Sequence, residues 1–153
     1  MALVIADMKV AATLEQFADL GCLMFEESRF RPYGFDRTAM LEYAHGVYRN
    51  PEGVALGAFD GPALVGMCIG ACGAILIGSR ATLAAAHLLF VAPPYRGGFA
   101  APRLIRSFIQ HSRARGAQNI TFSTSTGVAP ERTGRLFKAC GLSPIGSVYT
   151  TGD

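Results

Sequence analysis

The sequence carries little charge. Only 16% of its 153 residues are Asp, Glu, Lys or Arg, while 50% are hydrophobic; about a quarter of the residues in a soluble domain are usually charged. The formal net charge is +3, and no basic face with interleaved aromatic residues is apparent. The composition therefore predicts no nucleic-acid partner. It also favours an apolar surface patch, and with it a homodimer.

Cysteine and histidine are scarce as well. The four cysteines and three histidines are scattered, and their spacing matches no zinc-binding or disulfide framework. We therefore expect no metal site, and we expect Cys68 and Cys72 to be small buried hydrophobic residues. A chain without a disulfide framework favours a reducing, cytoplasmic location.

Long hydrophobic runs are also missing. The longest stretch without a charged residue, residues 61–79, contains five glycines and one proline. It predicts a core strand and a turn rather than a membrane span. No basic segment precedes an apolar one at the N-terminus, so we expect neither a signal peptide nor a membrane association.

The size and the hydrophobic spacing predict one α+β domain over residues 1–153. Strands are expected where apolar residues run continuously or alternate, and helices where they recur every three to four residues after a capping residue. The expected strands are residues 3–10, 54–59, 63–74, 82–91 and 119–126, with a possible edge strand at 147–151. The expected helices are residues 13–27, 37–49, 101–115 and about 130–140. Strands before, between and after the late helices predict a mixed, mostly antiparallel layer.

The most informative stretch is residues 88–106. An apolar strand ends at Pro93 and Pro94, which cannot continue a ladder, and a basic turn with Gly97 and Gly98 follows. A helix then starts, with Pro102 near its first position. Glycines allow a close approach of the backbone, and the free N–H groups of a helix N-terminus attract anions. This order of elements predicts a phosphate-binding loop.

The sequence of this stretch resembles the acetyl-CoA signature of the GNAT acetyltransferases. Val-x-Pro-x-Tyr-Arg-Gly-Gly is followed by Ala-Ala-x-Arg-Leu-Ile, which sets Arg96 at the first position of the signature and Ala101 at the last. Phe99 stands where the family has its middle glycine. Residues 131–142 are similar to the last helix and the following strand of the family. The resemblance implies a GNAT-like fold, with a mostly antiparallel sheet of six to seven strands flanked by about four helices, and acetyl-CoA as the cofactor.

The resemblance also implies which residues bind acetyl-CoA. The pyrophosphate is expected on the main chain of Arg96, Gly97, Gly98, Phe99, Ala100 and Ala101, and the pantetheine arm beside Leu89, Phe90 and Val91. Phe137 is expected at the cofactor because it takes a position of the last family helix. Arg96 and Arg103 could add positive charge toward the phosphates. Each of the two arginines could equally be a solvated surface residue.

Two candidates for proton transfer follow. Strand alternation sets His87 on the face of Leu89 and Val91, and an imidazole can accept the proton that an attacking amine loses. The alternative is a hydrogen-bonded core histidine. Phe137 stands where many family members have a tyrosine that protonates the departing thiolate. That role would fall to Tyr149, Ser125, Thr126 or water, unless Tyr149 only packs on an edge strand.

The resemblance implies an acceptor pocket around the first helix–loop–helix, where Glu27 would favour a cationic amine and Tyr33 an apolar body. Either residue could instead lie on a solvated helix end. The function expected is acetyl-CoA-dependent transfer of an acetyl group to a primary amine, with a small-molecule amine as the favoured acceptor. A catalytically silent acyl-CoA-binding module and a protein-modifying, toxin-like acetyltransferase are the alternatives.

Overall fold

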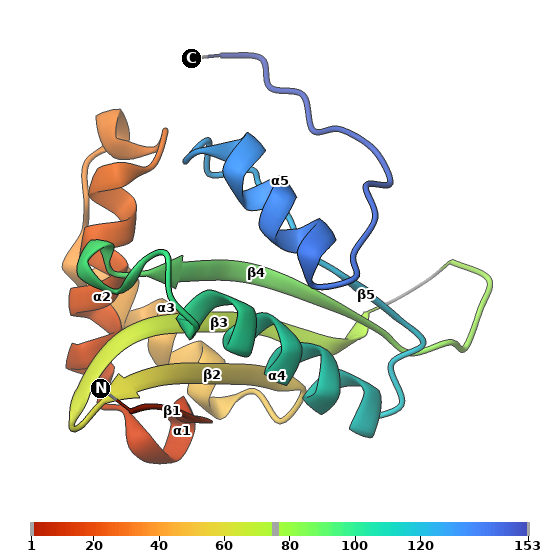
Figure 1. The fold of residues 1–153 in the computed structure, drawn as a ribbon, viewed down its shortest axis with the longest axis horizontal. Helices are drawn as coiled ribbons and strands as arrows, with labels where there is room; N and C mark the ends of the chain where they lie inside the picture. Colours follow the sequence, from red (N-terminus) through yellow and green to blue (C-terminus); the bar gives the residue numbers. More distant parts are fainter. Residues whose placement is uncertain (1, 75–76, 153) are drawn as a thin grey trace.

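A single five-stranded sheet forms the centre of the protein (Figure 1). The structure, a computed structural model, describes residues 2–74 and 77–152. The strands follow one another across the sheet in chain order: β1 (Leu3–Asp7), β2 (Gly53–Asp60), β3 (Ala63–Ala74), β4 (Leu83–Val91) and β5 (Asn119–Thr121). The first four strands pair antiparallel, and β5 pairs parallel to β4.

In the described part of the chain, five α-helices and two short 3-10 turns surround the sheet. They are α1 (Met8–Ala11), α2 (Leu14–Glu27), η1 (Arg31–Tyr33), α3 (Arg37–Arg49), η2 (Pro93–Tyr95), α4 (Ala100–Ala114) and α5 (Pro130–Ala139). α2 begins at a capping box, in which Thr13 and Gln16 each bond the other's backbone N–H, and α3 begins at Asp36, whose carboxylate accepts from the Ala39 amide. Within the described residues, no helix is both long enough and apolar enough to span a membrane.

The two faces of the sheet are covered by different helices. On one face α4 buries Leu104 and Phe108 against a cluster that includes Cys68. On the other face α2 and α3 bury Phe17 and Ala44 against Met67 and its neighbours. Cys68 and Cys72 are 0% and 3% exposed, so the prediction that both are small buried hydrophobic residues is confirmed.

β4 is irregular in the part that matters for function. Ile69 of β3 faces Leu88 and Gly70 faces Ala86, so His87 is the extra residue of a β-bulge. On its other side β4 pairs with β5 only at Leu83–Ala85, and the two strands then diverge. Beyond Ala85, the far edge of β4 therefore has no strand partner among the described residues. Figure 1 shows α5 lying over this opening.

The mixed α+β class is confirmed, but several predicted boundaries are wrong. The first strand ends at Asp7, because this residue caps α1 by accepting from the Lys9 amide. β5 ends at Thr121 rather than at residue 126, and residues 147–151 form no strand. The sheet of the described residues therefore has five strands, not six or seven. After β5 the ring of Phe122 packs on Phe108 and Phe137, at centroid distances of 5.5 and 5.4 Å, and the chain continues as a loop.

Candidate functional site

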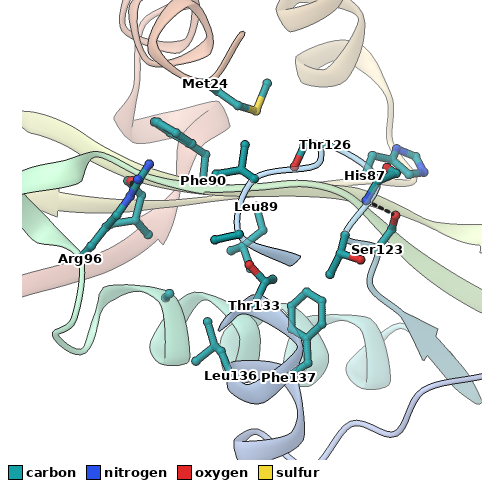
Figure 2. A pocket seen from close by; sticks show the side chains of 16 residues that line it. Met24, His87, Leu89, Phe90, Arg96, Ser123, Thr126, Thr133, Leu136 and Phe137 are labelled. Atoms are coloured by element: carbon teal, nitrogen blue, oxygen red, sulfur yellow. Dashed lines mark hydrogen bonds between the residues drawn. The ribbon is translucent and has the colours of Figure 1, made fainter. Parts of the chain in front are cut away.

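A cleft lies where β4 and β5 diverge. Its volume is about 150 Å³, and its walls come from β4, the turn into α4, the loop after β5, α5 and the last turn of α2 (Figure 2). The lining residues are Met24, His87, Leu89, Phe90, Val91, Arg96, Ala101, Ser123, Thr124, Ser125, Thr126, Val128, Ala129, Thr133, Leu136 and Phe137.

The cleft brings together nine of the residues that the sequence singles out. They are His87, Leu89, Phe90, Val91, Arg96, Ala101, Ser125, Thr126 and Phe137. Figure 2 shows that they belong to both sides of the sheet edge, with Phe90 on the side of Met24 and Leu89 on the side of Leu136 and Phe137. The cleft thus passes across the open edge of β4, from the α5 side to the α2 side.

Residues 96–101 form a loop with free main-chain donors, which we call the amide loop. Among the described residues, the amides of Gly97, Gly98, Phe99, Ala100 and Ala101 donate to no backbone or side-chain acceptor. Two of them are the first amides of α4, at the positive end of that helix. Gly97 has φ 81°, a conformation that favours glycine. This arrangement fits an anion such as a diphosphate.

Phe99 and Ala100 leave the space above the free amides open. Phe99 is 78% exposed, whereas Ala100 is 1% exposed and packs in the core. A Cβ atom added at Gly98 would meet only the Tyr95 carbonyl oxygen, at 3.9 Å. Arg103 lies outside the cleft wall and donates to the Leu3 carbonyl oxygen of β1. Positive charge from Arg103 is therefore directed to the sheet edge at β1.

Arg96 is engaged by the protein itself. Its guanidinium donates to both carboxylate oxygens of Glu27, at 2.5 and 2.6 Å, and its Nε donates to the Val91 carbonyl oxygen at 2.8 Å. It also lies over the Phe90 ring, 5.2 Å from the centroid. The hydrogen bonds from Arg96 lower the pKa of the Glu27 carboxyl below its ordinary value. The pair joins the end of α2 to the amide loop, so neither partner is a free charge.

His87 lies at the end of the cleft opposite Arg96 (Figure 2). Its side chain is exposed, so the structure does not make it a buried core histidine. The bulge explains the position, because an extra residue in a strand re-aims its side chain. Simple strand alternation, which predicted the face of His87, does not include such a bulge.

The loop between β5 and α5 supplies cleft residues that the sequence reasoning missed. Ser123 and Thr124 of this loop, together with Thr133 of α5, add hydroxyl groups beside Ser125 and Thr126, which the sequence already indicates. The run Ser-Thr-Ser-Thr at residues 123–126 was the available signal. Met24 was missed because nothing in its local sequence distinguishes it from other apolar residues of α2.

Arg29 anchors this loop through two hydrogen bonds. Its Nε donates to the Ser125 carbonyl oxygen at 2.7 Å, and its backbone N–H donates to the Thr126 carbonyl oxygen at 3.0 Å. At the start of α5, Ala129 has φ 40°, a strained value for a residue with a side chain. The loop is thus held in one shape by contacts from the end of α2.

Two predicted site residues lie away from the cleft. Tyr149 is 90% exposed in the irregular C-terminal segment, and Tyr33 is 74% exposed in η1. Neither side chain lines the cleft. Within the described part of the chain, no three His, Cys, Asp or Glu side chains gather in a way that could hold a metal ion.

Comparisons with known proteins agree with this geometry. The family model described as "Acetyltransferase (GNAT) family" matches residues 16–142. A transcriptional regulator from Bacillus halodurans C-125 superimposes with a TM-score of 0.82 at 14% identity, covering 99% of this chain and 100% of that chain. The aminoglycoside acetyltransferase AAC(6')-Iy, in complex with a bisubstrate analogue, gives 0.80 at 15% identity and coverages of 100% and 99%.

A ribosomal-protein-alanine N-acetyltransferase from Brucella melitensis biovar Abortus 2308 gives a TM-score of 0.72 at 18% identity, with both chains fully covered (100% each). No curated protein sequence matches the chain significantly. At these identities the superpositions show a shared fold.

Proposed function

The chain belongs to the GNAT acetyltransferase family, and from this premise we propose that it moves an acetyl group from acetyl-CoA directly to the primary amine of a small acceptor. The observation that carries the proposal is the set of free amides at residues 97–101 beside the open edge of β4. The amides suit the diphosphate of coenzyme A, and the strand edge suits an extended amide-bearing arm. AAC(6')-Iy, with its coenzyme A bisubstrate analogue, has the same fold and supports this assignment.

When bound, acetyl-CoA supplies an activated thioester. In the transfer, the amine nitrogen forms a bond to the acetyl carbon while the bond from that carbon to sulfur breaks, and coenzyme A leaves as the thiolate. The attacking amine must lose a proton, and His87 at the end of the cleft is placed to accept it, directly or through water. Holding the two reactants together in the cleft supplies much of the rate.

The departing thiolate is the less demanding part of the chemistry because it is already a stable anion. The cleft wall offers it hydroxyl donors at residues 123–126 and at Thr133. We assign the role to these hydroxyls or to water in preference to Tyr149, whose phenol lies outside the cleft wall. Phe137 contributes an apolar wall and no proton.

Phe137 is also the observation that favours a second function, a catalytically silent acyl-CoA-binding module. No phenol lines the cleft in the described part of the chain, and the family tyrosine position is occupied by this phenylalanine. The two functions differ in turnover rather than in binding. Tight acetyl-CoA binding without thiol release across a panel of amines would identify the silent module.

The decisive experiment for the proposed function is isothermal titration of the protein with acetyl-CoA, followed by a thiol-release assay with amines. We expect saturable binding in the micromolar range and amine-dependent release of coenzyme A. An absence of binding at millimolar acetyl-CoA would refute both the enzyme and the silent module.

The setting of the reaction is part of the same proposal. We place it in the cytoplasm, because the cysteines of the described residues are free thiols. We expect a homodimer, because apolar side chains such as Ile145 and Val148 are 88% and 73% exposed. Light scattering coupled to gel filtration measures the oligomeric state.

A further inference from the structure

A second cavity, which we call the groove, lies on the opposite face of the sheet edge. It has a volume of about 420 Å³, which suits a small organic ligand. α2, the segment after η1, α3 and β4 all contribute to its wall. Its apolar side chains are Met24, Phe25, Phe35, Met40, Tyr43 and Leu88.

The groove adjoins the cleft. Met24 lines both cavities, and Leu88 of the groove stands between His87 and Leu89 of the cleft on one strand. Leu88 packs with the α2 and α3 cluster, whereas Leu89 packs with the α4 cluster. A ligand in the groove therefore approaches the open edge of β4 from one face, while the amide loop and α5 lie on the other.

The groove wall is mostly aromatic and apolar. The rings of Phe25 and Phe35 pack at a tilt of 58° with their centroids 5.6 Å apart, and Tyr43 sets its ring edge-on to Phe17 at 6.0 Å. Burial raises the pKa of the Tyr43 phenol above its ordinary value, so the phenol is neutral. The single carboxylate among the lining residues of the groove is Asp36, which also caps α3.

This wall matches one kind of acceptor. An aromatic or large aliphatic body gains by burial against apolar side chains, whereas a polyhydroxylated polycation would lose its hydration without replacement partners. The single carboxylate of the groove wall is exposed and already accepts from the Ala39 amide, so the groove offers no set of partners for several ammonium groups. Glu27, the other acidic candidate near the site, is occupied by Arg96.

We propose that the groove is the acceptor site and that its substrate is a primary amine with one positive charge and an apolar, aromatic-sized body. The inference rests on the proposed function and deepens it, because it names the class of amine. The body of the amine occupies the groove, and its nitrogen reaches the cleft past Met24. Phenethylamine is a suitable probe, and kanamycin is the polycationic counter-probe.

The test uses two measurements on the full chain. Titration with each amine in the absence of acetyl-CoA reports the groove alone, and initial rates of thiol release report the transfer. We expect the kcat/KM for phenethylamine to exceed that for kanamycin by at least about 100-fold. Phe35→Ala is expected to raise the KM for phenethylamine about tenfold and to leave the KM for acetyl-CoA unchanged.

Two further variants sharpen the test. Leu23→Ala is the matched control, because Leu23 is 52% exposed and adjoins Met24 on α2 without lining either cavity. It should leave both KM values unchanged. Ala39→Trp fills the groove from an exposed position in the first turn of α3 and should abolish phenethylamine binding. It keeps the test valid if Phe35→Ala fails to fold.

The outcomes separate this inference from the proposed function. If acetyl-CoA binds and kanamycin or a peptide N-terminus is acetylated faster than phenethylamine, the inference is overturned and the function stands. If acetyl-CoA does not bind but phenethylamine does, and Ala39→Trp removes that binding, the groove is supported as an amine site and the function fails. Equal phenethylamine binding by Ala39→Trp and the parent overturns the inference.

Discussion

The two cavities along β4 recognise their ligands by different means. The amide loop offers backbone N–H groups, while Phe99 is exposed to solvent, Ala100 packs in the core and Arg96 donates to Glu27. The groove offers side chains from four separate segments and almost no polar group. The first arrangement is general for a diphosphate, whereas the second selects a particular shape and charge.

This difference explains how one fold can serve many acceptors. Main-chain recognition tolerates side-chain changes as long as the loop keeps its conformation, so it can be retained while the other wall changes. Side-chain recognition is altered by any substitution at the groove. Substitutions can therefore change the amide loop alone, the groove alone, or the Arg96–Glu27 pair that links α2 to the amide loop.

The largest effect on kcat is expected from a substitution of His87. Among the residues that line the cleft, His87 is the one histidine, the side chain best suited to accept a proton from the attacking amine. His87→Gln should lower kcat on the order of 100-fold and leave acetyl-CoA binding at the amide loop unchanged, because His87 lies at the end of the cleft opposite Arg96. Thiol-release rates and titration measure the two quantities. Tyr149→Phe is the companion variant, and an equal loss in it would move the proton-transfer role to Tyr149.

A substitution in the amide loop should separate the walls most clearly. Gly98→Val keeps an ordinary backbone conformation but fills the open space above the amides. We expect acetyl-CoA to bind about 30-fold more weakly, with phenethylamine binding in the groove unchanged. Gly46→Ala is the control, because its Cβ atom also meets nothing within 4 Å, in the exposed part of α3. Unchanged acetyl-CoA affinity in Gly98→Val would contradict the placement of the diphosphate.

A gain of activity is expected from Phe137→Tyr. The substitution adds a phenol to the α5 wall of the cleft, near the hydroxyls of residues 123–126. Because a thiolate needs little help to leave, the gain in kcat should be small, roughly threefold. Binding of both ligands should not change. A fall in kcat would show that the cleft requires an apolar wall at this position.

The smallest effect concerns the link between the walls, the Arg96–Glu27 pair. Both side chains are about one-third exposed, at 29% and 34%, so Glu27→Gln should cost at most about 1 kcal/mol of unfolding free energy at pH 7. The pKa of Glu27 is lowered in the folded protein, so its stabilisation is present above the ordinary carboxyl pKa of about 4.3 and is lost as the pH falls through the lowered value. Urea unfolding at pH 7 and near pH 3 measures this difference. A gap between parent and variant that widens in acid would contradict the role of the pair.

The sequence predicts the amide-loop side of the site well. The strand expected at 82–91 is found at Leu83–Val91, and the helix expected at 101–115 is found at Ala100–Ala114. Both are strongly periodic, and proline and glycine mark the boundary between them. α2 and α3 are also predicted closely, because Thr13 and Asp36 are capping residues with a side-chain oxygen in place.

The rest depends on contacts between distant segments. The groove gathers residues 24–25, 34–36, 39–40, 43 and 88, and the Arg96–Glu27 pair joins positions that are 69 residues apart. No local sequence pattern predicts contacts between residues so far apart in the chain. The end of β5 was missed for a similar reason, since packing of Phe122 between Phe108 and Phe137 is a tertiary event.

The incomplete pairing of β4 affects the tendency of the protein to aggregate in solution. From Ala86 to Val91 the strand has no strand partner among the described residues on the side away from β3, and unpaired edges recruit strands from other molecules. An occupant lying along that edge would shield it. Samples kept with coenzyme A should therefore stay clear at concentrations at which the ligand-free protein turns turbid.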